Sequence, residues 1–174
     1  IKHMLGNYPG DIGTYQLAVK NSNDFKGAIV IGLGEVDQLT SAGLTTSVEI
    51  AVTQYMLEYC KRGSETGNGL NGVSMLLIGT DYGGLSIESS IRSVLLGIQY
   101  ANAKINALKL EKIRLIEHVE FIELFEDRSL QAFYSFSKII NSTSDEIKAE
   151  FKSKSIKKLQ GSRKRLMAEN KSDW

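Results

Sequence analysis

The 174-residue sequence contains one cysteine, one proline, one tryptophan and two histidines. Because Cys60 is alone, an internal disulfide is excluded, and a reducing compartment is the expected setting. No window approaches the roughly 20 apolar residues of a membrane-spanning helix, and no secretory signal is visible at the start of the chain. We therefore expect a cytoplasmic protein that does not insert into a membrane. The chain starts at Ile1 rather than at methionine, which suggests a piece excised from a larger protein.

The histidines and the cysteine do not form a recognisable catalytic set. His118 lies inside a predicted strand, where it shares a face with Glu120, and a surface histidine is a simpler interpretation than a metal ligand. Cys60 has no histidine partner that the sequence can assign. Glu35 and Asp37 are interpreted as solvated loop carboxylates rather than as an acid and a base. We expect no catalytic residues, no metal and no cofactor in this chain.

Charge is nearly balanced overall but unevenly distributed. The formal net charge of +1 argues against a strong overall field for nucleic acid or membranes. From Lys138 to the end, however, there are ten lysines and arginines and five aspartates and glutamates. We predict one α/β domain over residues 1–140 and a basic extension over 141–174, in which Phe151–Leu159 forms a hairpin arm or a poorly ordered tail. Nucleic-acid binding is not expected, because Phe151 is the only aromatic residue near the lysines.

Two short apolar runs, each ending in a glycine-rich turn before a helical pattern, carry most of the information about the fold. Ala28–Ile31 leads into Gly32–Glu35, and Val73–Ile78 leads into Gly79–Leu85. Continuous aliphatic runs are typical of parallel strands that helices cover on both faces. The patterns predict the order strand, strand, helix, strand, helix, strand, helix. This order favours a three-layer α/β/α domain with a mainly parallel, mixed central sheet.

Apolar periodicity places the remaining elements. A period of two predicts strands over 14–19 and 115–125. Spacings of three and four predict a helix that begins at Thr40 or a few residues later and that Gly63 can terminate. Ser86 is a suitable N-cap for a second helix, and a third helix is expected over Ser129–Ile140. The expected buried positions of the first two helices are Leu44, Val48, Val52, Tyr55, Tyr59, Ile87, Ile91, Val94, Leu95, Ile98, Ala101 and Ile105.

The two glycine-rich turns are the candidate ligand site, because ligands of parallel sheets bind beyond the carboxyl ends of the strands. In the second turn, glycines let backbone N–H groups converge, and the helix N-terminus at Ser86 adds its positive end, so a phosphate could bind. Asp81 would oppose an anion, and a tight strand-to-helix turn explains the same glycines. The first turn lacks the third glycine of a dinucleotide fingerprint. The candidate ligand-binding residues are Gly32, Gly34, Gly79, Thr80, Tyr82, Gly83, Gly84 and Ser86.

Four segments stand out when they are read together: Leu5–Thr14, Gly27–Glu35, Leu77–Ser86 and Val119–Arg128. As a set they resemble a module of large bacterial CHAT-domain proteins, which carry a caspase-related peptidase domain elsewhere in the chain. The resemblance covers most of the sequence, but the His and Cys pair of the family's peptidase domain has no counterpart here. It therefore implies a non-catalytic scaffold or regulatory module whose partners are adjoining domains, a CHAT peptidase domain among them.

Gly32-Leu33-Gly34 after one strand and Gly79–Gly84 after another carry a second, weaker resemblance. They resemble the macrodomain-like N-terminal domain of leucine aminopeptidases, a domain that is not catalytic in those enzymes. In macrodomains the matching loops hold the phosphates of ADP-ribose. This resemblance implies an alternative function, a binder or hydrolase of ADP-ribose-type nucleotides. Asp81 and the lack of an assignable adenine-binding aspartate depart from that pattern.

Overall fold

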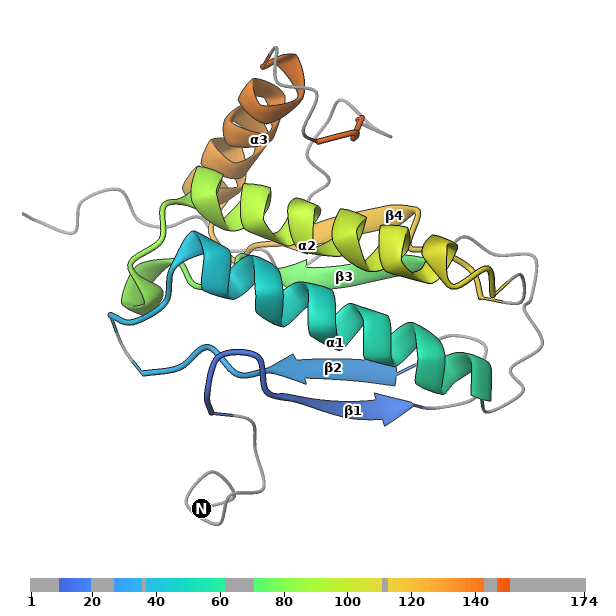
Figure 1. The fold of residues 1–174 in the computed structure, drawn as a ribbon. Helices are drawn as coiled ribbons and strands as arrows, with labels where there is room; N and C mark the ends of the chain where they lie inside the picture. Colours follow the sequence, from blue (N-terminus) through green and yellow to red (C-terminus); the bar gives the residue numbers. More distant parts are fainter. Residues whose placement is uncertain are drawn as a thin grey trace, which may run out of the picture.

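The computed structural model describes residues 10–19, 27–35, 37–61, 71–110, 113–142 and 147–150. Strands and helices follow one another in the predicted order (Figure 1). The elements are β1 (Tyr15–Val19), β2 (Gly27–Ile31), α1 (Ser41–Lys61), β3 (Gly72–Leu76), the 3-10 turn η1 (Asp81–Gly83), α2 (Ile87–Ala107), β4 (His118–Ile122) and α3 (Glu126–Asn141). No described helix combines the length and the apolar character needed to cross a bilayer.

The strands form two hydrogen-bonded pairs and give a mixed α/β fold. β1 pairs antiparallel with β2, with Leu17 opposite Ile29. β3 pairs parallel with β4, with Val73 opposite Val119. β2 and β3 point the same way beneath the helices (Figure 1), but no ladder joins them.

α1 and α2 run in the same direction and cover one face of the strands (Figure 1). Gly97 permits their close approach, because a Cβ at this position would lie 2.7 Å from the carbonyl oxygen of Thr45 and 2.8 Å from Val48 Cβ. The two helices and the strand side chains beneath them share one core. Its buried members are Leu39, Leu44, Val48, Val52, Met56, Val94, Ile98, Ala101, Ile105 and Ile116.

The other face of the strands has no helical cover among the described residues. Side chains alternate along each strand, so Val30, Leu76 and Ile122 point away from the core and are 40%, 67% and 37% exposed. We call this the bare face. The described residues therefore form two layers, and the second helical layer of the predicted α/β/α domain is not among them.

The first two helices match their predicted faces closely. Thr40 precedes α1, and its Oγ1 accepts a hydrogen bond from the N–H of Gly43 at 3.0 Å. Three expected core residues, Tyr55, Tyr59 and Ile87, are only half-buried, and the two tyrosines stack with their ring centroids 6.0 Å apart. Met56 is buried instead, because the apolar side of α1 faces α2.

The prediction of a strand over 115–125 is wrong in its length, because β4 spans only His118–Ile122. The side chain of Asn102 on α2 occupies both backbone groups of Ile116. Its Nδ2 donates to the carbonyl oxygen at 2.8 Å, and its Oδ1 accepts from the N–H at 2.9 Å. Ile116 is buried in the core, but its backbone is not available to a strand ladder.

α3 packs beside α2 through a smaller cluster of Leu77, Ile91, Leu95 and Ile139. It begins at Glu126, earlier than the predicted Ser129. Just before the helix, Glu123 Oε1 accepts the N–H groups of Leu124 at 2.7 Å and Phe125 at 3.3 Å, and Glu126 and Asp127 lie in the first turn. Acidic residues in the first turn also stabilise a helix N-terminus. The expected arm or tail over Phe151–Leu159 lies outside the described residues.

Candidate functional site

The two glycine-rich turns lie at the same end of the molecule, as their places after β2 and β3 predict (Figure 1). The side chain of Leu39, which precedes α1, reaches across to the second turn. A Cβ on Gly79 would lie 2.5 Å from Leu39 Cδ2, and one on Gly83 would lie 3.4 Å from it. Leu39 is 7% exposed. A buried leucine therefore fills the space beside the second turn.

The first turn is occupied by an upstream segment of the same chain. The N–H of Gly32 donates to the carbonyl oxygen of Thr14 at 2.8 Å, and the N–H of Gly34 donates to that of Gly10 at 2.7 Å. A Cβ on Gly32 would clash with the carbonyl oxygen of Asp11 at 2.1 Å. Glycine is required at this position by the close approach of two backbone segments. The N–H groups of both glycines already have acceptors within the protein.

The second turn also satisfies part of its own backbone. The N–H of Gly84 donates to the carbonyl oxygen of Asp81 at 3.1 Å, and the N–H of Leu85 donates to that of Gly79 at 3.0 Å. Gly79, Asp81 and Gly84 have φ values of 73°, 60° and 72°. Glycine adopts this left-handed region freely, and aspartate tolerates it better than most residues. The tight turn therefore accounts for these two glycines without a ligand.

Ser86 is the N-cap of α2, as predicted. Its Oγ accepts a hydrogen bond from the N–H of Ser89 at 3.1 Å, which satisfies one of the free donors of the first helical turn. The side chain of Tyr82, another predicted site residue, lies outside the described part of the structure.

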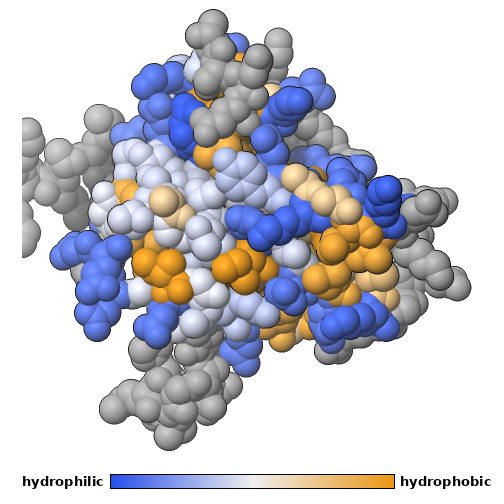
Figure 2. Space-filling model, viewed as in Figure 1, coloured by the Kyte–Doolittle hydropathy of each residue, from blue (hydrophilic) through white to orange (hydrophobic). Residues whose placement is uncertain are grey.

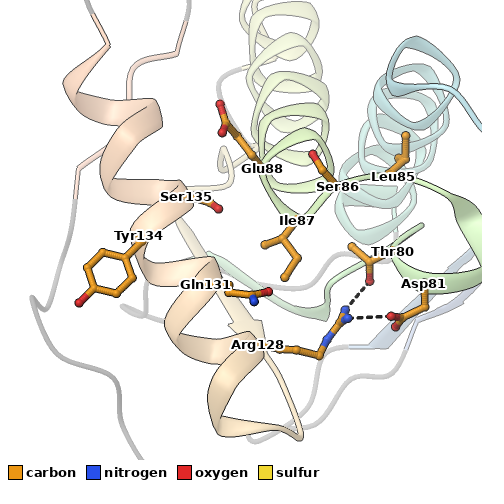
Figure 3. Close-up of a pocket in the computed structure, with 10 residues that line it drawn as sticks. All are labelled: Thr80, Asp81, Leu85, Ser86, Ile87, Glu88, Arg128, Gln131, Tyr134 and Ser135. Carbon is orange, nitrogen blue, oxygen red and sulfur yellow. Dashed lines mark hydrogen bonds and ion pairs between the residues drawn. The ribbon is translucent and has the colours of Figure 1, made fainter. Parts of the chain in front are cut away.

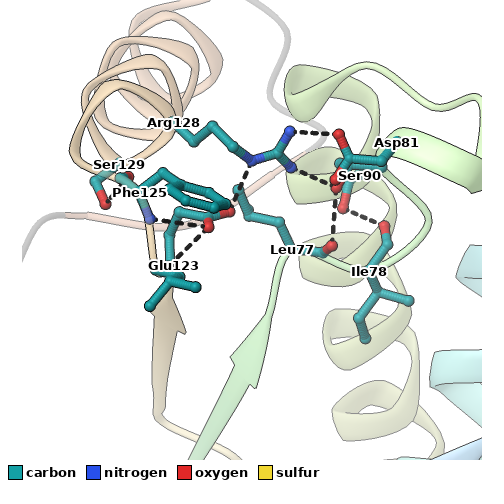
Figure 4. Close-up of polar contacts among 10 residues, drawn as sticks. Leu77, Ile78, Asp81, Ser90, Glu123, Phe125, Arg128 and Ser129 are labelled. Carbon is teal, nitrogen blue, oxygen red and sulfur yellow. Dashed lines mark hydrogen bonds and ion pairs between the residues drawn. The ribbon is translucent and has the colours of Figure 1, made fainter. Parts of the chain in front are cut away.

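Arg128, in the first turn of α3, connects three elements at this end of the molecule (Figure 4). Its Nε donates to Glu123 Oε2 at 2.9 Å, its Nη1 to Asp81 Oδ1 at 2.7 Å, and its Nη2 to Thr80 Oγ1 at 2.7 Å. Thr80 Oγ1 in turn donates to the carbonyl oxygen of Leu77 at 3.1 Å. The hydrogen bond with Glu123 raises the pKa of Arg128, so the guanidinium remains charged. Arg128 therefore holds the β3–α2 turn against α3.

A groove lies between this turn, the start of α2 and α3 (Figure 3). Its volume is about 640 Å³, and the predicted site residues Thr80 and Ser86 line it together with Arg128, Glu88 and Tyr134. The predicted glycines do not line it.

The charges around the groove oppose an anionic ligand. Asp81 and Glu88 line the groove, with side chains that are 62% and 33% exposed. The guanidinium of Arg128, only 12% exposed, is already paired with Asp81 and with Glu123, which is 14% exposed. A phosphate would have to compete with both carboxylates, and Glu123 would lose its cation in a largely buried place. The arrangement is better suited to holding the turn in place than to binding phosphate.

The other residues singled out in the sequence are not brought together. Glu35 Oε2 accepts a hydrogen bond from Gln38 Nε2 at 3.3 Å in an exposed loop. His118 starts β4, and Cys60 is half-buried near the end of α1. Across the described ranges, no group of three or more His, Cys, Asp or Glu side chains is placed to hold a metal ion.

Arg128 is the residue that sequence reasoning missed at this end of the molecule. A signal was present, because a cation is unfavourable in the first turn of a helix unless carboxylates lie near it. Glu123 and Arg128 flank the junction between β4 and α3. The predicted helix start at Ser129 placed Arg128 in a loop, so the unfavourable position of a cation in the first helical turn was not apparent.

Comparisons with protein-family models, with curated proteins and with solved structures give no match.

Proposed function

We propose that this chain is a non-catalytic scaffold or regulatory module of a larger protein, and that its bare face packs against an adjoining domain. The observation that supports this is the parallel β3–β4 pair, which has a helical layer on one face only among the described residues. Parallel strands are normally covered on both faces. Leu76 and Ile122 are opposite one another in the register and are 67% and 37% exposed.

The chemistry of the bare face fits a protein interface. Val30 on β2 adds a third exposed aliphatic side chain. Beside this apolar group, Ser74 Oγ donates to Glu120 Oε2 at 2.7 Å and provides a polar margin. Interfaces commonly combine an apolar centre with a polar rim. The face seen in Figure 2, over α1 and α2, carries separate hydrophobic side chains among polar and neutral ones at its centre, and a larger hydrophobic group at the right of the view.

The resemblance to CHAT-domain modules suggests which domain adjoins this one. We propose a CHAT peptidase domain in a bacterial, cytoplasmic protein, with the present module as its support or regulator. The network around Arg128 fits this role, because it keeps the β3–α2 turn and α3 in a fixed arrangement. A macrodomain-like binder or hydrolase of ADP-ribose-type nucleotides remains the alternative, and a titration described below tests it.

Thiol labelling tests the proposed interface. In a Cys60→Ser background, the Leu76→Cys variant places one thiol on the bare face, and the Tyr134→Cys variant places one on α3. The native side chains at these positions are 67% and 68% exposed, so the two variants are matched. Maleimide labelling rates are compared between this chain and a longer protein that includes its native neighbouring sequence.

We expect the Leu76→Cys variant to react at least tenfold more slowly in the longer protein and the Tyr134→Cys variant to react at the same rate in both. Equal rates for the Leu76→Cys variant in both proteins would contradict the proposed interface. If the module regulates a peptidase, the Leu76→Lys variant of the longer protein should also change its peptidase activity.

A further inference from the structure

The outer edge of β4, on the side away from β3, has no strand partner among the described residues. Within the described ranges, β4 pairs with β3 along one edge, and no strand pairs with the other. An unpaired edge exposes a row of backbone donors and acceptors, which natural proteins usually cover or pair.

The chain returns to this side of the molecule after α3. Ile147 packs on the cluster of Leu77, Ile91, Leu95 and Ile139, against which Val119 and Phe121 of β4 also pack. The N–H of Lys148 donates to Gln99 Oε1 on α2 at 3.1 Å. In the view of Figure 1, residues 147–150 lie past β4 on the side away from β3.

Burial alternates along this returning segment. Ile147 and Ala149 are half-buried, whereas Lys148 and Glu150 are exposed. Alternation with a period of two is typical of a strand with one covered face. The sequence continues the pattern, since an apolar or small residue stands at each odd position from Phe151 to Ser155 and a lysine stands at 152 and 154. Lysines are common on edge strands, where they discourage further pairing.

We propose that the outer edge of β4 is a strand-docking site and that its occupant is the chain's own segment Ile147–Ser155. An extended segment of this length spans about 30 Å, more than the roughly 17 Å of β4. In this alternation the even-numbered residues, including Lys152 and Lys154, would lie on the bare face, where Glu120 of β4 is exposed. Charge also favours the contact, because residues 151–174 contain eight Lys or Arg and two Asp or Glu, a formal charge of +6, which leaves −5 on residues 1–150. This inference does not depend on the proposed function.

Hydrogen exchange in the full chain tests the docking, because odd-numbered and even-numbered residues of the docked strand direct their N–H groups to opposite edges. N–H groups of successive strand residues point to opposite edges. Gln99 accepts the N–H of Lys148, so the N–H groups of odd-numbered residues should point toward β4. The Phe151→Pro variant removes such a group, whereas the Lys152→Pro variant removes one that points away. The Phe151→Ala variant measures the loss of the ring alone.

We expect exchange of the β4 amides to accelerate at least tenfold in the Phe151→Pro variant, less in the Phe151→Ala variant, and by less than twofold in the Lys152→Pro variant. Equal exchange in both proline variants would overturn the proposal.

Disulfide trapping identifies the occupant. In a Cys60→Ser background, Glu120→Cys is combined with Lys152→Cys or Lys154→Cys, and the matched control combines it with Phe151→Cys on the opposite face. We expect an intramolecular disulfide in one of the lysine combinations and none in the control. Disulfide-linked dimers would instead assign the edge to a second copy of the chain, and the absence of any disulfide would also overturn the proposal.

Discussion

Replacing Arg128 by methionine removes the guanidinium and keeps an unbranched apolar stem in its place. The exposure of its partners determines the expected cost. The pair with Glu123 is largely buried, at 12% and 14% exposure, whereas Asp81 is 62% exposed. Removing one partner of a fully buried ion pair costs roughly 3–5 kcal/mol, and an exposed pair contributes about 0–1 kcal/mol. Glu123 also accepts two backbone N–H groups, which remain in the variant. We therefore expect the Arg128→Met variant to lose about 2–3 kcal/mol of unfolding free energy.

Double-mutant cycles in urea denaturation separate the two carboxylates. The cycle with Glu123→Gln should give a coupling of about 1.5–2.5 kcal/mol, and the cycle with Asp81→Asn a coupling below about 1 kcal/mol. Added salt should reduce the coupling with Asp81 more than that with Glu123, because buried pairs are screened less. A coupling with Asp81 equal to or larger than the one with Glu123 would refute the argument from burial.

The Gly97→Ala variant should lose about 1–3 kcal/mol because its Cβ meets backbone of α1, whereas Gln54→Ala on the exposed side of α1 should change the unfolding free energy by less than about 0.5 kcal/mol. Ser86→Ala should cost about 1 kcal/mol through loss of the N-cap, and Ser86→Asp should keep most of it, as thermal unfolding would show. Burial raises the pKa of Tyr55 above 10.0, so the unfolded chain loses this proton first and stability should fall as pH rises past 10. Denaturation of Tyr55→Phe across that range should lack this part of the decline. Calorimetric titration with millimolar ADP-ribose should give no heat of binding; a saturable heat that the Thr80→Ala variant abolishes would instead support the nucleotide-binding alternative.

The order of elements and the faces of the helices could be predicted because periodicity reports which side of an element is buried. Val48 and Val52, or Val94 and Ile98, recur at helical spacing and do form the core. The length of β4 could not be predicted in this way. An apolar alternating stretch looks the same whether its backbone pairs with a strand or with a side chain, and here Asn102 of α2 takes both groups of Ile116.

The placement of the turns could be predicted, but their chemistry could not. Parallel strands bring their carboxyl ends to one edge, so Gly34 and Gly83 were expected at the same end. Glycines that cradle a phosphate and glycines that form a tight turn have the same sequence pattern, and the deciding contacts come from distant residues such as Gly10 and Arg128. Thr80 illustrates the consequence. Its hydroxyl bonds Arg128 and the backbone, so its replacement by alanine should lower the melting temperature even without a ligand.

The common direction of α1 and α2 sets the electrostatic character of one pole of the molecule. Each helix contributes roughly half a positive elementary charge at its N-terminus, so two aligned helices give this pole about one unit from peptide dipoles alone. Asp81 and Glu88 bring side-chain carboxylates to the start of α2. These carboxylates are paired with Arg128 and Lys138, and the first turn of α1 contains no acidic residue, so the peptide dipole of α1 keeps this pole positive beside the paired charges at the start of α2.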